Sequence, residues 1–182
     1  KIQCQYIPYG SEISYLNNNS LLSFYHISSQ EYFLLMSRMA PENNIETILD
    51  GFNKSNSEKK FLVIGNTNNS FGQKIQKKFK KDKRILFAGA IYDTTVTHTL
   101  KYFSALYFHG HSVGGTNPSL LEAMGSGSLI AAHQNEFNLS VLQKDAYYFQ
   151  SSKDVEQLIE SVSRDKKEEQ MVQNNLLKIE RK

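Results

Sequence analysis

The sequence predicts an α/β fold in which helices cover both faces of a parallel sheet. Short apolar runs with strand character alternate along the chain with longer stretches whose apolar residues recur at helical spacing. Several of the apolar runs end at a glycine, as expected where a strand gives way to a turn. The chain has 182 residues, 40% of them hydrophobic, which is enough for one core of this kind. This alternation is typical of a Rossmann-like domain.

Six strands are expected in chain order at the apolar runs. They are Glu31–Ser37, Phe61–Ile64, Ile85–Ala88, Ala105–Phe108, Leu129–Ala132 and Ala146–Phe149. The stretches between them and after the last one favour helices, because their apolar residues fall on one face. These helices are expected at Glu42–Asn53, around the basic residues 74–84, at Thr94–Tyr102, from Pro118, near 137–143 and from Ser151 or Ser152.

The chain divides into three parts. Residues 31–163 form the predicted α/β domain, and the less regular 1–30 is expected to be a crossover segment from a missing N-terminal domain. The chain starts at Lys1 rather than Met, which indicates an excised piece. From Arg164 to Lys182 the chain is highly charged and is expected to be a C-terminal helix or tail.

Composition excludes several classes of protein. Charged residues make up 21% of the chain, as in ordinary globular proteins, and the net charge is only +3. The single cysteine, Cys4, excludes an internal disulfide and is consistent with a reducing cytoplasm. No apolar run reaches the ~18 residues of a membrane span, and no signal peptide is visible. We therefore expect a cytoplasmic protein.

Basic residues crowd into 74–84 with Ile75 and Phe79 at helical spacing among them. The simpler interpretation is the solvated outer face of an amphipathic helix. The alternative is a surface for anionic lipid or a phosphorylated acceptor, which would place the protein at the inner face of the membrane. Nucleic acid is not an expected partner, because no stacking aromatics are interleaved with the lysines.

Residues 109–127, HGHSVGGTNPSLLEAMGSG, are the most informative stretch. Gly114 and Gly115 would let the backbone approach a ligand, and Thr116 or Asn117 is a good N-cap for a helix with Pro118 in its first turn. Free N–H groups at that helix start favour an anion. Glu122, expected on the first turn, suits a nucleotide whose ribose hydroxyls donate to a carboxylate.

This stretch resembles the C-terminal half of the family 4 retaining glycosyltransferases, which have the GT-B fold and use nucleotide-sugar donors. Their common pattern is two glutamates separated by seven residues in a helix of the LLEAMA type. Leu121-Glu122-Ala123-Met124 supplies the second glutamate, whereas Gly114 stands where the first would be. The string HGHSVGGTNPSLLEAM is most similar to a rhamnosyltransferase-like branch.

The resemblance implies a role for each matching residue. Arg38 follows the first strand and would bind the diphosphate, as a guanidinium can through two directed hydrogen bonds. Asn43 stands where the family often has lysine, and it would offer only a neutral hydrogen bond. Glu122 would bind ribose. The diphosphate and donor sugar would meet Gly114, Gly115, Thr116, Asn117 and Ser119, and the base would meet Gly89, Ala90 and Ile91.

His109 and His111 are separated by one residue, a spacing that allows a metal pair. No cysteine or carboxylate stands nearby at a familiar ligand spacing, so we expect no metal and no cofactor. Either histidine would instead donate to an oxygen of the leaving diphosphate or of the sugar. With Arg38 they are the predicted catalytic residues.

We expect the donor-binding domain of a retaining enzyme. It would transfer a sugar from a UDP- or dTDP-sugar to a glycan or lipid-linked acceptor in polysaccharide biosynthesis. The missing N-terminal domain would supply the acceptor side, so this chain alone should be inactive. A non-catalytic binding or interaction domain and a related GT-B epimerase or phosphorylase remain open. An oxidoreductase is disfavoured, because no GxGxxG follows the first strand.

Overall fold

The six predicted strands form one parallel sheet. A computed structural model describes residues 10–14, 19–113, 115 and 117–180. The strands are β1 (Tyr32–Met36), β2 (Lys60–Ile64), β3 (Ile85–Gly89), β4 (Leu106–His109), β5 (Ile130–His133) and β6 (Tyr147–Phe149). Their order in the sheet is β3-β2-β1-β4-β5-β6, and every neighbouring pair is parallel. This order confirms the Rossmann-like prediction.

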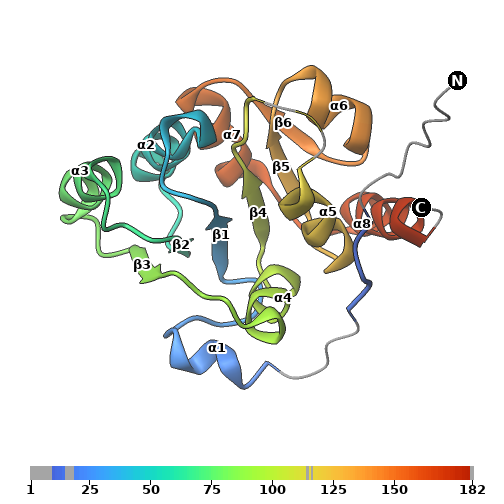
Figure 1. The fold of residues 1–182 in the computed structure, drawn as a ribbon, viewed down its shortest axis with the longest axis horizontal. Helices are drawn as coiled ribbons and strands as arrows, with labels where there is room; N and C mark the ends of the chain where they lie inside the picture. Colours follow the sequence, from blue (N-terminus) through green and yellow to red (C-terminus); the bar gives the residue numbers. More distant parts are fainter. Residues whose placement is uncertain (1–9, 15–18, 114, 116, 181–182) are drawn as a thin grey trace, which may run out of the picture.

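Helices cover both faces of the sheet (Figure 1). They are α1 (Leu21–Phe24), α2 (Ile45–Lys54), α3 (Ser70–Phe79), α4 (Thr94–Tyr102), α5 (Pro118–Gly125), α6 (Glu136–Leu142), α7 (Ser152–Ser161) and α8 (Lys166–Glu180). Alternate residues of each strand point to opposite faces, so the core divides into two clusters. Phe33 and Leu35 of β1 pack with α2, α3 and α7, whereas Tyr32 and Leu34 pack with α1, α4 and α5.

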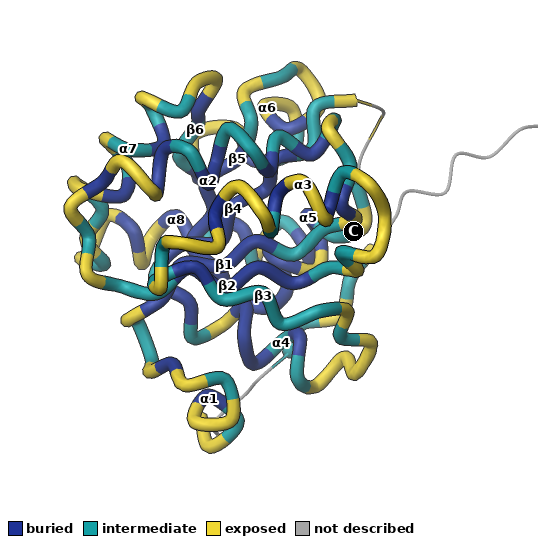
Figure 2. The backbone as a smooth tube through the Cα atoms, turned by 90° about the vertical axis from the view of Figure 1, so that its left-hand side faces the viewer, coloured by how far each residue is buried: buried dark blue, intermediate teal, exposed yellow. Residues whose placement is uncertain are grey.

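The central strands are buried on both faces, as Figure 2 shows by their dark blue tube. All four residues of β4 are buried. The C-terminal helix α8 closes the end of this core. It contributes Met171 and Val172 to one cluster and Ile179 to the other, so the predicted charged tail is an integral part of the domain.

The helix predicted at Glu42–Asn53 begins later than expected. A short 3-10 turn, η1 (Pro41–Asn43), comes first, and Asn44 then adopts a left-handed conformation with φ of 49° before α2 starts at Ile45. Asparagine tolerates this conformation better than most residues. The hydrophobic spacing predicts the rest of α2 correctly but carries no information on this break.

Helices α2 and α7 pack so closely that Gly51 has no space for a side chain. A Cβ atom built there would lie 2.5 Å from the Ser152 carbonyl oxygen and 2.6 Å from Val155 Cβ. Replacing a helical glycine by alanine ordinarily stabilises a protein by up to about 1 kcal/mol. The backbone carbonyl of Ser152 cannot rotate away as a side chain can, so the contact reverses that gain.

We expect Gly51→Ala to lower the free energy of unfolding by about 1–3 kcal/mol, the usual range for overpacking. Asn53→Ala is the control, because Asn53 is exposed on the same helix and the change should stabilise by about 0.5 kcal/mol. Urea denaturation of both variants measures the difference. A stabilised Gly51→Ala variant would contradict the close packing of α2 on α7.

Candidate functional site

The carboxyl ends of β1 and β4 open onto a cavity of about 280 Å³. The strands β2 and β3 are added on one side of β1, and the strands β4, β5 and β6 on the other. The loops that follow β1 and β4 therefore diverge. The cavity is lined by Met36, Ser37, Arg38, Asn43, Phe108, His109, Gly110, His111, Asn117 and Ser119. It therefore brings together predicted catalytic and diphosphate residues from three separate parts of the chain.

Asn43 is buried and both ends of its amide are hydrogen-bonded within the protein. Its Nδ2 donates to the Arg38 carbonyl oxygen at 2.7 Å, and its Oδ1 lies 2.9 Å from His111 Nδ1. Since Oδ1 can only accept, His111 Nδ1 carries the proton in this pair. Asn43 thus orients the His111 ring by binding Nδ1. The other ring nitrogen of His111, Nε2, makes no bond to Asn43.

Further asparagines hold the backbone of the loop between β4 and α5. Asn44 Nδ2 donates to the Gly110 carbonyl oxygen at 2.8 Å. Asn135 and Asn138, at the start of α6, both donate to the His111 carbonyl oxygen, at 3.0 and 3.1 Å. These bonds fix the loop and occupy carbonyl oxygens that would otherwise repel an anion.

Gly110 allows the loop to pass this close to the first half of the domain. A Cβ atom on Gly110 would lie 1.9 Å from the Asn43 carbonyl oxygen. No other amino acid fits there without moving one of the two backbones.

His109 is buried at the end of β4 beside the cavity, and its Nε2 has no hydrogen-bond partner among the described residues. Burial, together with a smaller effect of the neighbouring His111, lowers the pKa of His109 to about 3. His109 is therefore neutral near pH 7, so it can offer a neutral hydrogen bond but not an imidazolium. An unsatisfied buried polar atom beside a cavity is a common mark of a ligand site.

Arg38 lies at the mouth of the same cavity with its side chain largely exposed. Its Nη2 is 2.9 Å from Oε1 of Glu42, which lies four residues further along the chain in the 3-10 turn η1. A solvent-exposed pair of this kind is worth little, so an anion in the cavity could replace Glu42 at small cost. Arg38 lines this cavity, and its role as a diphosphate ligand stays a prediction.

The start of α5 faces this cavity through Asn117 and Ser119. Asn117 is the N-cap, and its Oδ1 accepts from the Ser119 backbone N–H at 2.9 Å and from Ser119 Oγ at 2.8 Å. Pro118 occupies the first turn, as predicted. Of the residues predicted to bind the diphosphate or the sugar, Gly114 and Thr116 lie outside the described part of the chain. Gly115 is exposed, and no atom lies within 4 Å of a Cβ built there.

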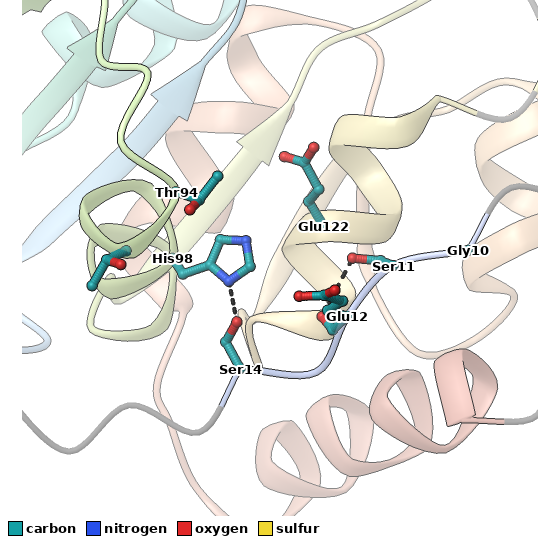
Figure 3. A pocket seen from close by; sticks show the side chains of 8 residues that line it. Gly10, Ser11, Glu12, Ser14, Thr94, His98 and Glu122 are labelled. Atoms are coloured by element: carbon teal, nitrogen blue, oxygen red, sulfur yellow. Dashed lines mark hydrogen bonds between the residues drawn. The ribbon is translucent and has the colours of Figure 1, made fainter.

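A second cavity, of about 620 Å³, lies next to α5 around Glu122. Figure 3 shows it between Glu122 of α5, Thr94 and His98 of α4, and the segment Gly10–Ser14. Glu122 lies on the second turn of α5 rather than the first, because α5 begins at Pro118 and has no acidic residue in its first turn. The carboxylate is half exposed, and its Oε2 accepts from Lys101 Nζ at 2.9 Å.

Two polar residues that the sequence pattern does not indicate, Lys101 and His98, lie around Glu122. Lys101 is buried near the end of α4, and His98 is hydrogen-bonded to Ser14. Burial and the charge of Lys101 lower the pKa of His98. The sequence offers one sign of the buried Lys101: it directly follows Leu100, and both residues are on the buried part of α4.

The predicted base-binding residues lie at the end of β3, where Gly89 is the last strand residue, and they line neither of the two cavities. Gly89 has a positive φ of 72°, and its carbonyl oxygen accepts from the Gly65 N–H at 2.8 Å. Ala90 is exposed, whereas Ile91 is half-buried and packs against the cluster of α4 and α5. The loop has backbone groups available next to α4, and the role of these residues stays a prediction.

Two negative findings concern the described residues. They contain no group of three or more His, Cys, Asp and Glu side chains that could hold a metal ion. None of their helices is long and apolar enough to cross a membrane.

The basic cluster is partly neutralised. Lys74 and Lys78 of α3 form ion pairs with Glu46 and Asp50 of α2. The exposed lysines of this cluster are Lys74, Lys77, Lys78, Lys80, Lys81 and Lys83. Contact with an anionic membrane stays a prediction.

The buried His109 predicts a pH dependence of stability. Its pKa is about 3 in the folded protein and 6.5 in the unfolded chain, so the unfolded state binds more protons between these values. Stability therefore falls as the pH drops through this range, and His109 accounts for about 2 kcal/mol of the loss between pH 7 and pH 5.

We expect His109→Gln to remove that part of the loss. Urea denaturation of both proteins at pH 7 and pH 5 gives the change in unfolding free energy within each, which cancels any packing difference between them. Equal pH dependence in the two proteins would show that His109 is not buried in its neutral form.

Comparison with solved structures supports the same architecture. The chain resembles Anabaena Alr3699/HepE, crystallised with UDP and glucose, with a TM-score of 0.77 and 13% identity over 88% of this chain and 46% of that one. The C-terminal domain of the group 1 family glycosyl transferase LpcC from Francisella tularensis gives a TM-score of 0.74 and 18% identity over 93% and 94% of the two chains. An α,α-trehalose-phosphate synthase (UDP-forming) from Burkholderia vietnamiensis gives 0.73 and 9% over 90% and 43%.

These likenesses establish the fold, a Rossmann-like α/β domain with a parallel sheet. The chain spans about half the length of the Anabaena protein. No curated protein sequence matches it. The family model for glycosyl transferases group 1, in contrast, matches residues 24–178, which include both cavities except the segment Gly10–Ser14. This chain belongs to the glycosyl transferases group 1 family.

Proposed function

We propose that this chain is the donor-binding half of a retaining glycosyltransferase that takes its sugar from UDP- or dTDP-sugar. One observation carries the proposal: α5 presents Ser119 to one cavity and Glu122 to the other. A nucleoside diphosphate has the same two parts, an anionic diphosphate and a ribose with hydroxyl donors. The cavity with Arg38 suits the first, and the cavity with Glu122 suits the second.

In this proposal the protein stabilises the leaving diphosphate. Negative charge develops on the diphosphate as the bond to the sugar breaks, and Arg38 and the start of α5 face that position. His109 is neutral near pH 7, so it contributes a hydrogen bond to the diphosphate without carrying a charge itself. The acceptor, a glycan or a lipid-linked sugar, would attack with retention at the sugar carbon.

Two observations support the wider setting of the proposal. The Anabaena neighbour was crystallised with UDP and glucose and with UDP-glucose. The exposed lysines around 77–83 suit an anionic acceptor or lipid. We place the activity in polysaccharide biosynthesis in the cytoplasm, at the inner face of the membrane.

A thermal-shift screen of the chain with UDP, dTDP, GDP and ADP tests the nucleotide. Stabilisation by UDP or dTDP above that by GDP and ADP is expected, because binding to the folded state alone raises the melting temperature. A response to none of the four would reject the proposal.

Arg38→Ala separates the diphosphate from the nucleoside. We expect it to weaken UDP binding by roughly ten- to a hundredfold, the size of a charge-assisted hydrogen bond, and to leave uridine binding nearly unchanged. Calorimetric titration with both ligands measures this. Lys77→Ala is the control, since it removes one exposed positive charge on α3, a helix that contributes no residue to either cavity. Equal losses for UDP and uridine would show that Arg38 acts through stability instead.

The 182-residue chain should bind UDP but transfer no sugar. It supplies the donor side only, and a half-cleft leaves the sugar in water without the closure that orients the reactants. Donor turnover is measured with and without the rest of the protein, using UDP- and dTDP-sugars and a lipid-linked or glycan acceptor. Efficient transfer by this chain alone would contradict the division of labour and favour a complete site around His109 and His111.

A further inference from the structure

Lys101 is an unusual residue for the place it occupies. Its side chain is 1% exposed, between α4 and α5, although lysine is almost never fully buried in proteins unless it is paired. Removing an ammonium group from water is costly, and a hydrophobic residue of similar size at such a site is often as stable or more so. Packing alone therefore gives no reason for a lysine here.

The ion pair of Lys101 is one-sided. The cation is dry, whereas its partner Glu122 is 48% exposed and lines the larger cavity. Lys101 Nζ donates to Oε2 at 2.9 Å, and within the described part of the chain no hydrogen bond to Oε1 is present. The lysine thus fixes one carboxylate oxygen from behind and leaves the other facing the cavity.

Lys101 is itself held in place. Its carbonyl oxygen accepts from Ser104 Oγ at 2.8 Å and from Ser128 Oγ at 3.0 Å, which anchors the last turn of α4. The other titratable groups facing the pair are His98 from α4, Tyr107 from β4 and Glu12 from the N-terminal segment. None of these supplies a second cation to Glu122, since burial and Lys101 lower the pKa of His98.

We propose that Lys101 is a positioning residue, which holds the Glu122 carboxylate in the orientation that accepts hydrogen bonds from the ribose hydroxyls. The inference rests on the proposed function and adds a residue that acts through Glu122 without touching the ligand. A carboxylate fixed before binding loses little conformational freedom when the ribose arrives, and this preorganisation increases affinity.

The preference for a hydroxylated ribose is the measurable quantity. Calorimetric titration compares UDP with its 2′,3′-dideoxy analogue, which keeps the base and diphosphate but cannot donate to Glu122. We expect the unmodified chain to prefer UDP by about ten- to a hundredfold. Lys101→Met should reduce the preference to below about threefold while the affinity for the dideoxy analogue is unchanged. If Lys101 had a purely structural role, its replacement would weaken the binding of both ligands by the same factor.

Companion variants sharpen the test. Lys101→Arg retains the charge and should recover at least part of the preference. Lys101→Leu, which also removes the donor, repeats the test if the Met variant folds poorly. Lys77→Met makes the same substitution at an exposed helical position of α3 and should change nothing. Because Lys101 acts through Glu122, adding Lys101→Met to Glu122→Gln should cause no further loss of preference.

The outcomes separate this inference from the proposed function. If the unmodified chain fails to bind UDP, or if Glu122→Gln keeps the full preference, the ribose assignment itself is wrong. If Glu122→Gln loses the preference but the Met and Leu variants of Lys101 keep it, only the positioning role is overturned. If those Lys101 variants lose affinity equally for UDP and for the dideoxy analogue, the positioning role is also overturned, because the change then affects the fold in general.

Discussion

The pairing of β1 with β4 is the constraint on which the site depends. The chain builds β1, β2 and β3 outward in one direction and then returns to place β4 against the other side of β1. The loops after β1 and β4 therefore run to opposite sides, and the space between them cannot be filled by a neighbouring connection. Arg38 reaches this space from one strand and His109 from the other. The fold makes the cavity, and the side chains determine which ligand fits it.

Asparagine side chains make many of the hydrogen bonds that hold this site. Asn43 links the Arg38 carbonyl oxygen to the His111 ring through hydrogen bonds at the two ends of its amide. Asn44, Asn135 and Asn138 engage further carbonyl oxygens of the same loop. Buried polar groups that are fully hydrogen-bonded make a loop rigid. Among the described residues, two buried polar atoms that line this cavity have no hydrogen-bond partner, His109 Nε2 and Ser37 Oγ, and a ligand can satisfy both.

Sequence patterns predicted the parts of this structure that are set by periodicity. The strands were placed to within a few residues, and the N-terminus of α5 was predicted at Pro118, because apolar runs and cap residues are local signals. The left-handed Asn44 and the late start of α2 could not be predicted, since they depend on a hydrogen bond to Gly110, 66 residues away. Lys101 was missed for a similar reason. Its partner lies on another helix, and the spacing within α4 does not reveal it.

The last helix of the fold has a consequence for synthesis. Met171 and Val172 of α8 complete one hydrophobic cluster and Ile179 the other, while Lys178 Nζ binds Asp145 Oδ2 at 2.6 Å and Asn175 Nδ2 the Asp145 carbonyl at 2.7 Å. Both hydrophobic clusters are therefore completed only when α8 packs against them. On the ribosome, the sheet can assemble early, but neither face is fully sealed until residue 179 has left the exit tunnel. Until then the nascent domain exposes apolar surface on both sides, which is the form that chaperones recognise.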